Sequence, residues 1–342
     1  MIQIFKFLLL LFVLTNDAIA QPTALYRGTL IDGHSQVRCD INPVEVGQII
    51  NSTDIDYVML SASGCNNREK FFSDPITQYK NLADVVTGNS KIFGLAGMKN
   101  LTNRGVWNHT ALKESWKIGE QAKFKGIAEI LFQHAVWDGQ DARLKYAGLQ
   151  LRLSGSDLEK VILFHEEKNF PFIIHIEFND SADKKEGTLK DLQILLNQYP
   201  SVSFVLIHVG QASPEIARDL LENHSNIYFL TSMTSGFFQI FTRGKQVHHQ
   251  HGWETFFDVS GKNMKQHASR PKWRSEWLSL VSDYPDKFIL GFDNVFAGNW
   301  RKRYRVDVVI WRRGLAQLDR ELARQLACGN AKRLWSLPVD CQ

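Results

Sequence analysis

Short runs of apolar residues alternate with longer amphipathic stretches along almost the whole chain. Eight of these runs have the length of β-strands and lie at 28–34, 55–62, 91–97, 126–132, 171–177, 203–209, 226–231 and 287–293. Most are continuously hydrophobic, which is typical of strands covered on both faces in a parallel sheet. Several intervening stretches have helical periodicity, among them 156–169, 187–199, 214–224 and 303–327. The pattern therefore predicts an α/β protein in which strand and helix alternate eight times.

Eight strand–helix repeats are most simply arranged as a closed (β/α)8 barrel of the TIM type. The alternative is an open doubly wound sheet, which normally has a glycine-rich phosphate-binding turn after its first strand; IDGHSQVR is not such a turn. The longest interval between strands, 232–286, separates strands seven and eight, and we interpret it as a lid loop over the active site. Residues 21–342 are expected to form one domain.

The first 20 residues have the pattern of a secretory signal peptide. Lys6 precedes an unbroken apolar run at 7–14, and Ala18 and Ala20 supply the small residues of a cleavage site. The run is shorter than the ~20 residues that a membrane helix needs, and no other stretch reaches that length. We expect cleavage after Ala20 and a secreted or periplasmic protein with no stable membrane anchor. An uncleaved N-terminal anchor is the alternative.

Composition and charge narrow the class of protein further. Of the 342 residues, 44% are hydrophobic and 22% are charged, which excludes a disordered tail protein, a collagen-like repeat and a small disulfide-stapled scaffold. The formal net charge is only +4, so no nucleic-acid partner is expected. The densest basic segment, 301–313, has the spacing of a solvent-exposed helix face.

Titratable and polar residues gather where the apolar runs end. In a (β/α)8 barrel the active site is built at the carboxyl ends of the strands, so these residues are expected to face one mouth. They are Asp32, His34, Gln36, Glu129, His175, Glu177, His208 and Asp293. Buried imidazoles and carboxylates are costly unless they are paired or bind a metal. Nitrogen and oxygen donors together favour a divalent cation, zinc first and manganese or iron as alternatives, over calcium.

Simpler roles remain open for some of these positions. Asp32 is equally consistent with a structural hydrogen-bond acceptor, and Glu129 with an outward side chain paired with a helix lysine. A second histidine group lies in the predicted lid at His248, His249, His251 and His267. We interpret this group as part of a solvated loop, with extra metal ligands or a pH-sensitive lid as the alternative.

Four strand-end motifs and one near the C-terminus together resemble a known family. They are LIDGHSQ, FIIHIE, FVLIHVG and ILGFDN, followed by CGNAKRLWSL. In this order they resemble the amidohydrolase superfamily, specifically its amidohydrolase-related branch, which includes decarboxylase-like and lactonase-like members. The resemblance implies that His34, His175 and Asp293 bind a metal, with Glu129 as a further carboxylate ligand. It also implies that His208 polarises the substrate carbonyl and that Asp293 takes a proton from water.

The first motif departs from the family pattern, because Gln36 stands where a second histidine is usual. The chain is then expected to bind metal through the remaining ligands, to work without metal as some lactonase-like relatives do, or to have kept binding without catalysis. The leading expectation is an exported metal-dependent hydrolase of a small amide, ester or lactone. A non-oxidative decarboxylase and a catalytically silent ligand-binding protein are the alternatives.

Four cysteines, an even number, are consistent with disulfides in an exported protein. Cys39 and Cys65 follow strands one and two, which are neighbours in the predicted barrel. We therefore expect one bridge between Cys39 and Cys65 and another between Cys328 and Cys341.

Overall fold

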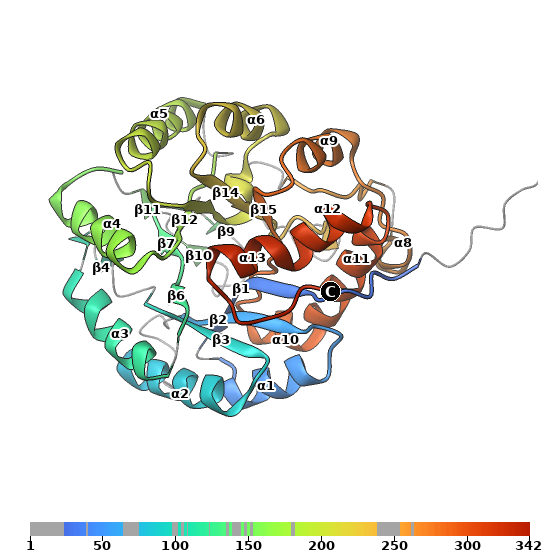
Figure 1. The fold of residues 1–342 in the computed structure, drawn as a ribbon, viewed down its shortest axis with the longest axis horizontal. Coiled ribbons are helices and arrows are strands. Elements are labelled where there is room, and N and C mark those ends of the chain that lie inside the picture. Colours follow the sequence, from blue (N-terminus) through green and yellow to red (C-terminus); the bar gives the residue numbers. More distant parts are fainter. Residues whose placement is uncertain are drawn as a thin grey trace, which may run out of the picture.

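Eight parallel strands form the centre of the protein, and helices surround them (Figure 1). The computed structural model describes residues 24–38, 40–63, 75–97, 102–103, 106–107, 109–122, 124–134, 137–138, 145–146, 149–150, 153–178, 182–237, 254–260 and 263–342. The proposed signal peptide and the pair Cys39 and Cys65 lie outside these residues.

Hydrogen bonding joins the strands in two sheets. The first has the order β1 (Ile31–Arg38), β2 (Tyr57–Ser63), β3 (Ile92–Ala96) and β6 (Gly126–Ile127). The second has the order β7 (Ile130–Leu131), β12 (Phe172–His175), β13 (Phe204–Leu206), β14 (Ile227–Leu230) and β15 (Phe288–Ile289). Strands β6 and β7 are the two ends of the fourth barrel strand, which is interrupted at Ala128 and Glu129. All eight predicted strands are present.

Backbone hydrogen bonds between the first and last strands close the barrel. Gly33 N donates to Leu290 O at 2.8 Å, and Asp293 N donates to His34 O at 2.8 Å. Gln36 N donates to Asn294 O at 2.9 Å. The predicted (β/α)8 barrel is therefore confirmed, and the open doubly wound sheet is wrong.

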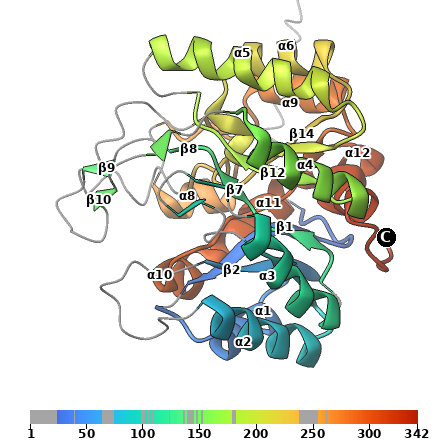
Figure 2. The same cartoon turned by 90° about the vertical axis from the view of Figure 1, so that its left-hand side faces the viewer.

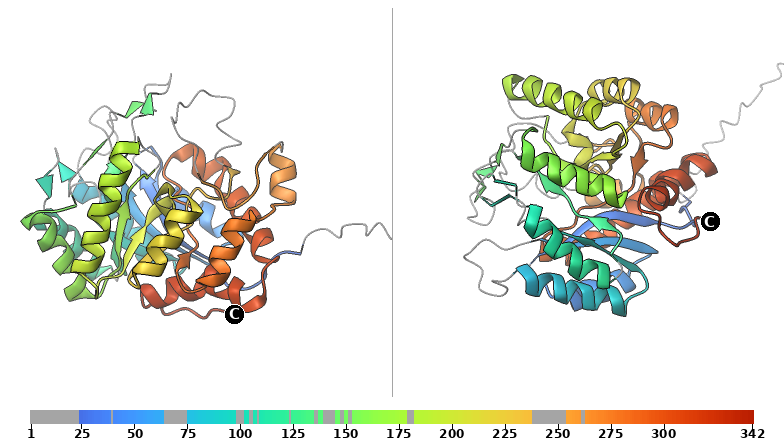
Figure 3. Two further views of the ribbon diagram at one scale, coloured as in Figure 1. Left: turned by 90° about the horizontal axis from the view of Figure 1, so that it is seen from above. Right: turned by 60° about the vertical axis from the view of Figure 1, so that its left-hand side comes forward.

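An outer layer of helices covers the strands, as the two views in Figure 3 show. It contains α1 (Pro43–Asn51), α2 (Pro75–Gly88), α3 (His109–Gln121), α4 (Ser156–Lys168), α5 (Ala182–Gln198), α6 (Pro214–Asn223), α9 (Ser275–Asp283) and α11 (Tyr304–Leu315). Shorter helices are α8 (Met264–Ser269), α10 (Ala297–Lys302), α12 (Arg320–Arg324) and α13 (Asn330–Leu334), with the π-helical turn η4 (Gln325–Gly329) before α13. No helix in the described part of the chain is long and apolar enough to cross a membrane.

Small antiparallel pairs lie beyond the barrel strands. They are β4 (Thr102–Asn103) with β5 (Val106–Trp107), β8 (Gln133–His134) with β11 (Leu149–Gln150), and β9 (Trp137–Asp138) with β10 (Lys145–Tyr146). Figure 2 shows β9 and β10 on the side of the molecule opposite the C-terminus. Because β8 follows the fourth barrel strand, these pairs mark the end of the barrel where the strands finish.

The C-terminal segment closes the other end of the barrel. Its buried residues Trp335, Leu337 and Val339 belong to the same apolar cluster as the inward-facing strand residues Ile31 and Ile173. A disulfide joins Cys328 to Cys341, as predicted. The C-terminal segment therefore lies at the end of the barrel opposite the carboxyl ends of the strands, where the mouth is.

The interval 232–286 and the segment 303–327 differ in detail from the sequence-based expectation. The interval 232–286 is not a loop throughout, because α8 and α9 lie within it and α9 belongs to the outer helix layer. Residues 238–253 and 261–262, which include His248, His249 and His251, lie outside the described part, so the lid stays a prediction. The segment 303–327 is helical as expected and is divided, since α11 ends at Leu315 and α12 begins at Arg320.

The basic segment is not uniformly solvent-exposed. Arg303 is buried and its Nε donates to Asp307 Oδ2 at 2.7 Å. Arg312 is also buried; it donates to the carbonyl oxygens of Tyr26 and Asp54. The helical spacing was correct, but two of the guanidinium groups are internal cross-links, because burying a charge requires a partner.

Candidate active site

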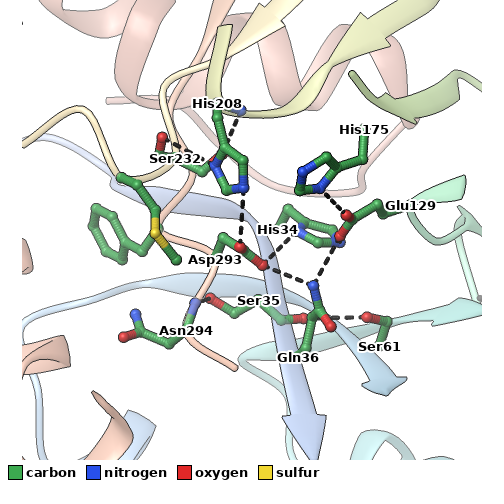
Figure 4. A network of polar contacts seen from close by, with 12 residues as sticks. His34, Ser35, Gln36, Ser61, Glu129, His175, His208, Ser232, Asp293 and Asn294 are labelled. Carbon is green, nitrogen blue, oxygen red and sulfur yellow. Dashed lines mark hydrogen bonds and ion pairs between the residues drawn. The ribbon is translucent and has the colours of Figure 1, made fainter. Parts of the chain in front are cut away.

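Strand β1 carries two side chains of the mouth, and its pairing with β2 contains an irregularity. Between Asp32 and Ser35, three steps along β1 match two along β2, which is a bulge. His34, within this bulge, and Gln36, after it, point toward the same group of carboxylates (Figure 4). Asp32 points elsewhere, so the bulge separates a structural residue from the site residues.

Asp32 ties the first strand to the last. Its Oδ1 accepts from Phe292 N at 2.9 Å and its Oδ2 accepts from Ser35 Oγ at 2.6 Å. Full burial raises the pKa of this carboxyl to about 7, although these donors oppose the shift. Of the two roles left open for Asp32, the structure supports that of a structural hydrogen-bond acceptor.

Gln36 connects two carboxylates from distant parts of the chain. Its Nε2 donates to Glu129 Oε2 and to Asp293 Oδ1, each at 2.8 Å, and all three side chains are buried. Its backbone is fixed as well, because Trp300 Nε1 donates to Gln36 O at 2.9 Å. The position that departs from the family pattern therefore lies at the centre of the site.

His34 lies beside the same two carboxylates and is fully buried. Its Nδ1 is 3.4 Å from Asp293 Oδ1 and its Nε2 is 3.8 Å from Glu129 Oε2. Neither nitrogen makes a hydrogen bond within the part of the chain that the structure describes. Burial alone would lower the pKa of His34, but the carboxylates of Asp293, Glu129 and Asp32 raise it above its usual value. Binding of a cation to this ring would therefore release a proton from it.

His175 lies between two carboxylates of its own. Its Nδ1 is 2.5 Å from Glu129 Oε1 and its Nε2 is 3.0 Å from Glu177 Oε1. Burial opposes protonation, but the two carboxylates outweigh it and raise the pKa of His175 to about 10. Glu129 points inward and links this imidazole to Gln36, so the alternative of an outward Glu129 paired with a lysine is wrong.

His208 sits in a left-handed turn that follows strand β13. This turn, η3 (Ile207–Gln211), has positive φ angles of 54°, 57°, 67° and 51° at residues 208 to 211. Left-handed backbone costs roughly 1–2 kcal/mol at each residue other than glycine, so the turn stores strain next to the site.

Ser232, which follows strand β14, orients the His208 ring. Its Oγ lies 2.9 Å from His208 N and 3.0 Å from Nδ1. On the opposite side of the ring, Nε2 is 3.5 Å from Asp293 Oδ2. Burial lowers the pKa of His208 to about 4, the charge of nearby His175 adds to this, and the carboxylates oppose it. His208 is therefore neutral at pH 7, while His175, with ring centroids 5.0 Å apart, is protonated.

Asp293 is the residue on which the other groups converge. Burial would raise its pKa, but the contacts with His34 and the charges of the neighbouring histidines lower it to about 2. The backbone at Asp293 has φ 49°, which directs the side chain back across the mouth. It is a buried, ionised carboxylate between two imidazoles.

The site can accept a divalent cation through a subset of the predicted ligands. One donor atom each from His34, Glu129 and Asp293 lie within 4.8 Å of one another. Within the described part of the chain neither nitrogen of His34 makes a hydrogen bond, although each lies near a carboxylate, so a cation held by these carboxylates could also take one of the nitrogens as a ligand. The fourth predicted ligand, His175, contacts Glu129 instead and is not in this group. The assignment of the metal ligands therefore stays a prediction.

Sequence reasoning did not assign roles to Ser232, Glu177 or the Gln36 bridge. Ser232 directly follows the seventh apolar run, so the rule that strand ends carry the site could have selected it. Two more buried carboxamides, those of Gln133 and Asn294, follow strands four and eight and have no hydrogen-bond partner in the described ranges. Ser232 and Glu177, which contact His208 and His175, thus enlarge the polar set beyond the motifs.

No model of a known protein family matches the sequence, and neither does any curated protein. Solved structures do resemble it. An amidohydrolase from Burkholderia multivorans aligns with TM-score 0.52 in a form with bound HEPES and 0.50 in a form with bound zinc; identity is 13%, over 91% of this chain and 100% of that chain.

A protein from Pseudomonas putida proposed to be a 2-pyrone-4,6-dicarboxylic acid hydrolase aligns with TM-score 0.51 and 13% identity, over 91% of this chain and 99% of its own. At such low identity the likeness concerns the fold. The expected resemblance is confirmed at that level: the chain has the barrel fold of these amidohydrolases.

Proposed function

We propose that this protein is a hydrolase that cleaves a small amide, ester or lactone with the help of a divalent cation, zinc first and manganese or iron as alternatives. The observation that carries the proposal is His34, a buried imidazole that has no hydrogen-bond partner among the described residues and lies beside two buried carboxylates. The amidohydrolase fold of the solved structures supports the same reaction class. His34, Glu129 and Asp293 would hold the cation.

Bound there, a divalent cation would polarise the substrate carbonyl and lower the pKa of water. Side chains of the protein would orient the water, accept its proton and stabilise the oxyanion. Asp293 is ionised at neutral pH, so it orients the attacking water and accepts its proton at a carboxylate oxygen.

His208 serves the oxygen of the substrate carbonyl. Because its pKa is about 4, the ring is neutral and carries one proton. Ser232 Oγ, 3.0 Å from Nδ1, can donate to that nitrogen, and the carboxylate of Asp293, 3.5 Å from Nε2, stabilises a proton on Nε2. The ring proton is then on Nε2, where it can donate to the developing oxyanion.

Replacing Asp293 by Asn tests the mechanism. Asparagine tolerates the positive φ of this position and can still accept from Gln36, so the fold should persist. It cannot take up the proton, and turnover should fall by about 10²–10⁴-fold. The measurement is hydrolysis of a panel of lactones, aryl esters and amides with Zn²⁺ or Mn²⁺ added, alongside circular dichroism.

Asp286→Asn, the same change at an exposed residue, is the matched control and should keep full turnover. Wild-type turnover in the Asp293→Asn variant would refute the proposal.

We also propose that the protein is exported. The N-terminal pattern and the disulfide between Cys328 and Cys341 support this, because disulfides persist in oxidising compartments. N-terminal sequencing of the protein recovered outside the cytoplasm should begin at Gln21. Recovery of the intact chain, starting at Met1 and retained in the membrane, would instead support the uncleaved anchor.

A further inference from the structure

We propose that the Gln36 side-chain amide is an exchangeable placeholder between Glu129 and Asp293. Its NH2 group bridges the two carboxylates when no cation is present, and its oxygen turns toward the cation when one binds. This inference rests on the proposed function, since it concerns the same cation site. It assigns to Gln36 a role in both states of the site.

The bridge supplies what two adjacent carboxylates need in the absence of a cation. Glu129 Oε2 and Asp293 Oδ1 each lie 2.8 Å from the same nitrogen, and the three side chains are between 3% and 4% exposed. Buried carboxylate oxygens need hydrogen-bond donors because water is largely excluded, and the contact of His175 is with the other oxygen of Glu129, Oε1. A primary amide offers two N–H donors on one nitrogen, so one side chain can serve both oxygens.

The same bridge would oppose a cation, because the two N–H groups point into the region that the carboxylates enclose. Rotation of the amide by half a turn removes this conflict, since the NH2 group and the oxygen have nearly the same size. The backbone does not need to move. It is held on both sides by the bonds from Gln36 N to Asn294 O and from Trp300 Nε1 to Gln36 O.

After that rotation the cation would meet three oxygens, from Gln36, Glu129 and Asp293, and one nitrogen, from His34. A carboxamide oxygen is a harder donor than imidazole nitrogen, so this set shifts the preference from zinc toward manganese. The metal-free protein would remain folded, because its carboxylates stay satisfied.

The experiment compares wild type with Gln36→Met, which has similar length but no hydrogen-bond donor and only a weakly accepting thioether sulfur in place of the amide oxygen. Each protein is dialysed against a chelator, its melting temperature is measured, and Mn²⁺ and then Zn²⁺ are titrated calorimetrically. A placeholder predicts two losses together: the metal-free variant melts at a lower temperature, and it binds Mn²⁺ about 10-fold or more weakly. Gln48→Met on the exposed face of α1 is the matched control and should change neither quantity.

Each simpler role of Gln36 predicts only one of these losses. A residue that only stabilises the metal-free site would leave Mn²⁺ binding unchanged or tighter in Gln36→Met, and a pure ligand would leave the metal-free melting temperature unchanged. Either result overturns the proposal, as does the absence of Mn²⁺ and Zn²⁺ binding to wild type.

Gln36→Glu supplies an oxygen without the NH2 group, so it should recover Mn²⁺ binding while the metal-free protein stays less stable than wild type. A protein that binds Mn²⁺ as stated but hydrolyses no member of the substrate panel would refute the proposed function and leave the placeholder intact.

Discussion

The single residue His165, which lies outside the candidate site, makes the stability of the protein depend on pH because it is buried. It lies in α4, fully buried, with Nδ1 donating to Val161 O at 2.8 Å and its ring edge-on to Phe172, the centroids 4.6 Å apart. Burial lowers its pKa from 6.5 to about 4, against a smaller opposing effect of the bond to Val161. The folded protein therefore keeps this imidazole neutral where the unfolded chain protonates it.

The unfolded state binds the extra proton between these two pKa values, so stability falls as pH decreases from about 6.5 toward 4. One group contributes a slope of about 1.4 kcal/mol per pH unit in that window. In the His165→Leu variant we expect this contribution to the pH dependence of the free energy of unfolding to be absent. Urea unfolding of both proteins from pH 4 to 7.5 measures it, and a difference between the two curves that does not vary with pH would contradict the assignment.

At the residue scale the sequence located most of the mouth but not its connections. His34, His175, His208 and Asp293 could be selected because each ends an apolar run. The bridge from Gln36 could not be predicted, since its two acceptors are 93 and 257 positions away and the contact depends on the closed barrel. The inward direction of Glu129 depends in the same way on the break between β6 and β7.

The turn η3 is the element that most clearly departs from expectation. The run SFVLIHV predicted a strand to residue 209, but β13 ends at Leu206. Apolar patterning cannot distinguish the last residues of a buried strand from a buried left-handed turn, because both are hydrophobic. The same ambiguity explains why the eight strands were predicted correctly while several of their ends were not.

At Gly210, in η3, both the backbone angle and a close neighbour oppose a side chain. Its φ is 67°, and an added Cβ would lie 3.0 Å from a ring carbon of Phe178. We expect Gly210→Ala to lower the free energy of unfolding by about 1–3 kcal/mol and to reduce turnover by moving His208. Urea unfolding and kinetics on the same preparation test both effects.

Gly298→Ala provides the matched control. This glycine lies in α10 with open space around it, so the change should be neutral or stabilise by up to about 1 kcal/mol. Equal effects of the two substitutions would show that the left-handed turn has no special constraint.

At the scale of the whole molecule, the two ends of the barrel have separate roles. The mouth carries the titratable residues, and the opposite end is sealed by Trp335, Leu337 and Val339 with the disulfide from Cys328 to Cys341. Removing the cross-link with Cys341→Ser should lower the free energy of unfolding by about 3 kcal/mol, because the unfolded chain regains the entropy of a short loop.

The same variant should retain the Mn²⁺ affinity of wild type, because the bond lies at the far end from His34 and Asp293. Thermal unfolding and calorimetry measure the two quantities. Asp340→Ser, an exposed neighbour in the same segment, is the control for a local effect of the substitution. Loss of Mn²⁺ binding in Cys341→Ser alone would show that the two ends are coupled.

The closure of the barrel also bears on the order in which the protein folds. Bonds such as Asp293 N to His34 O join residues from opposite ends of the folded chain, and loop-closure entropy makes such contacts late events. The Gln36 bridge spans the same seam, so it is expected to form after the transition state. Interactions of that kind slow unfolding without speeding folding. The residues assembled for chemistry would then also set how long the native barrel persists once it has formed.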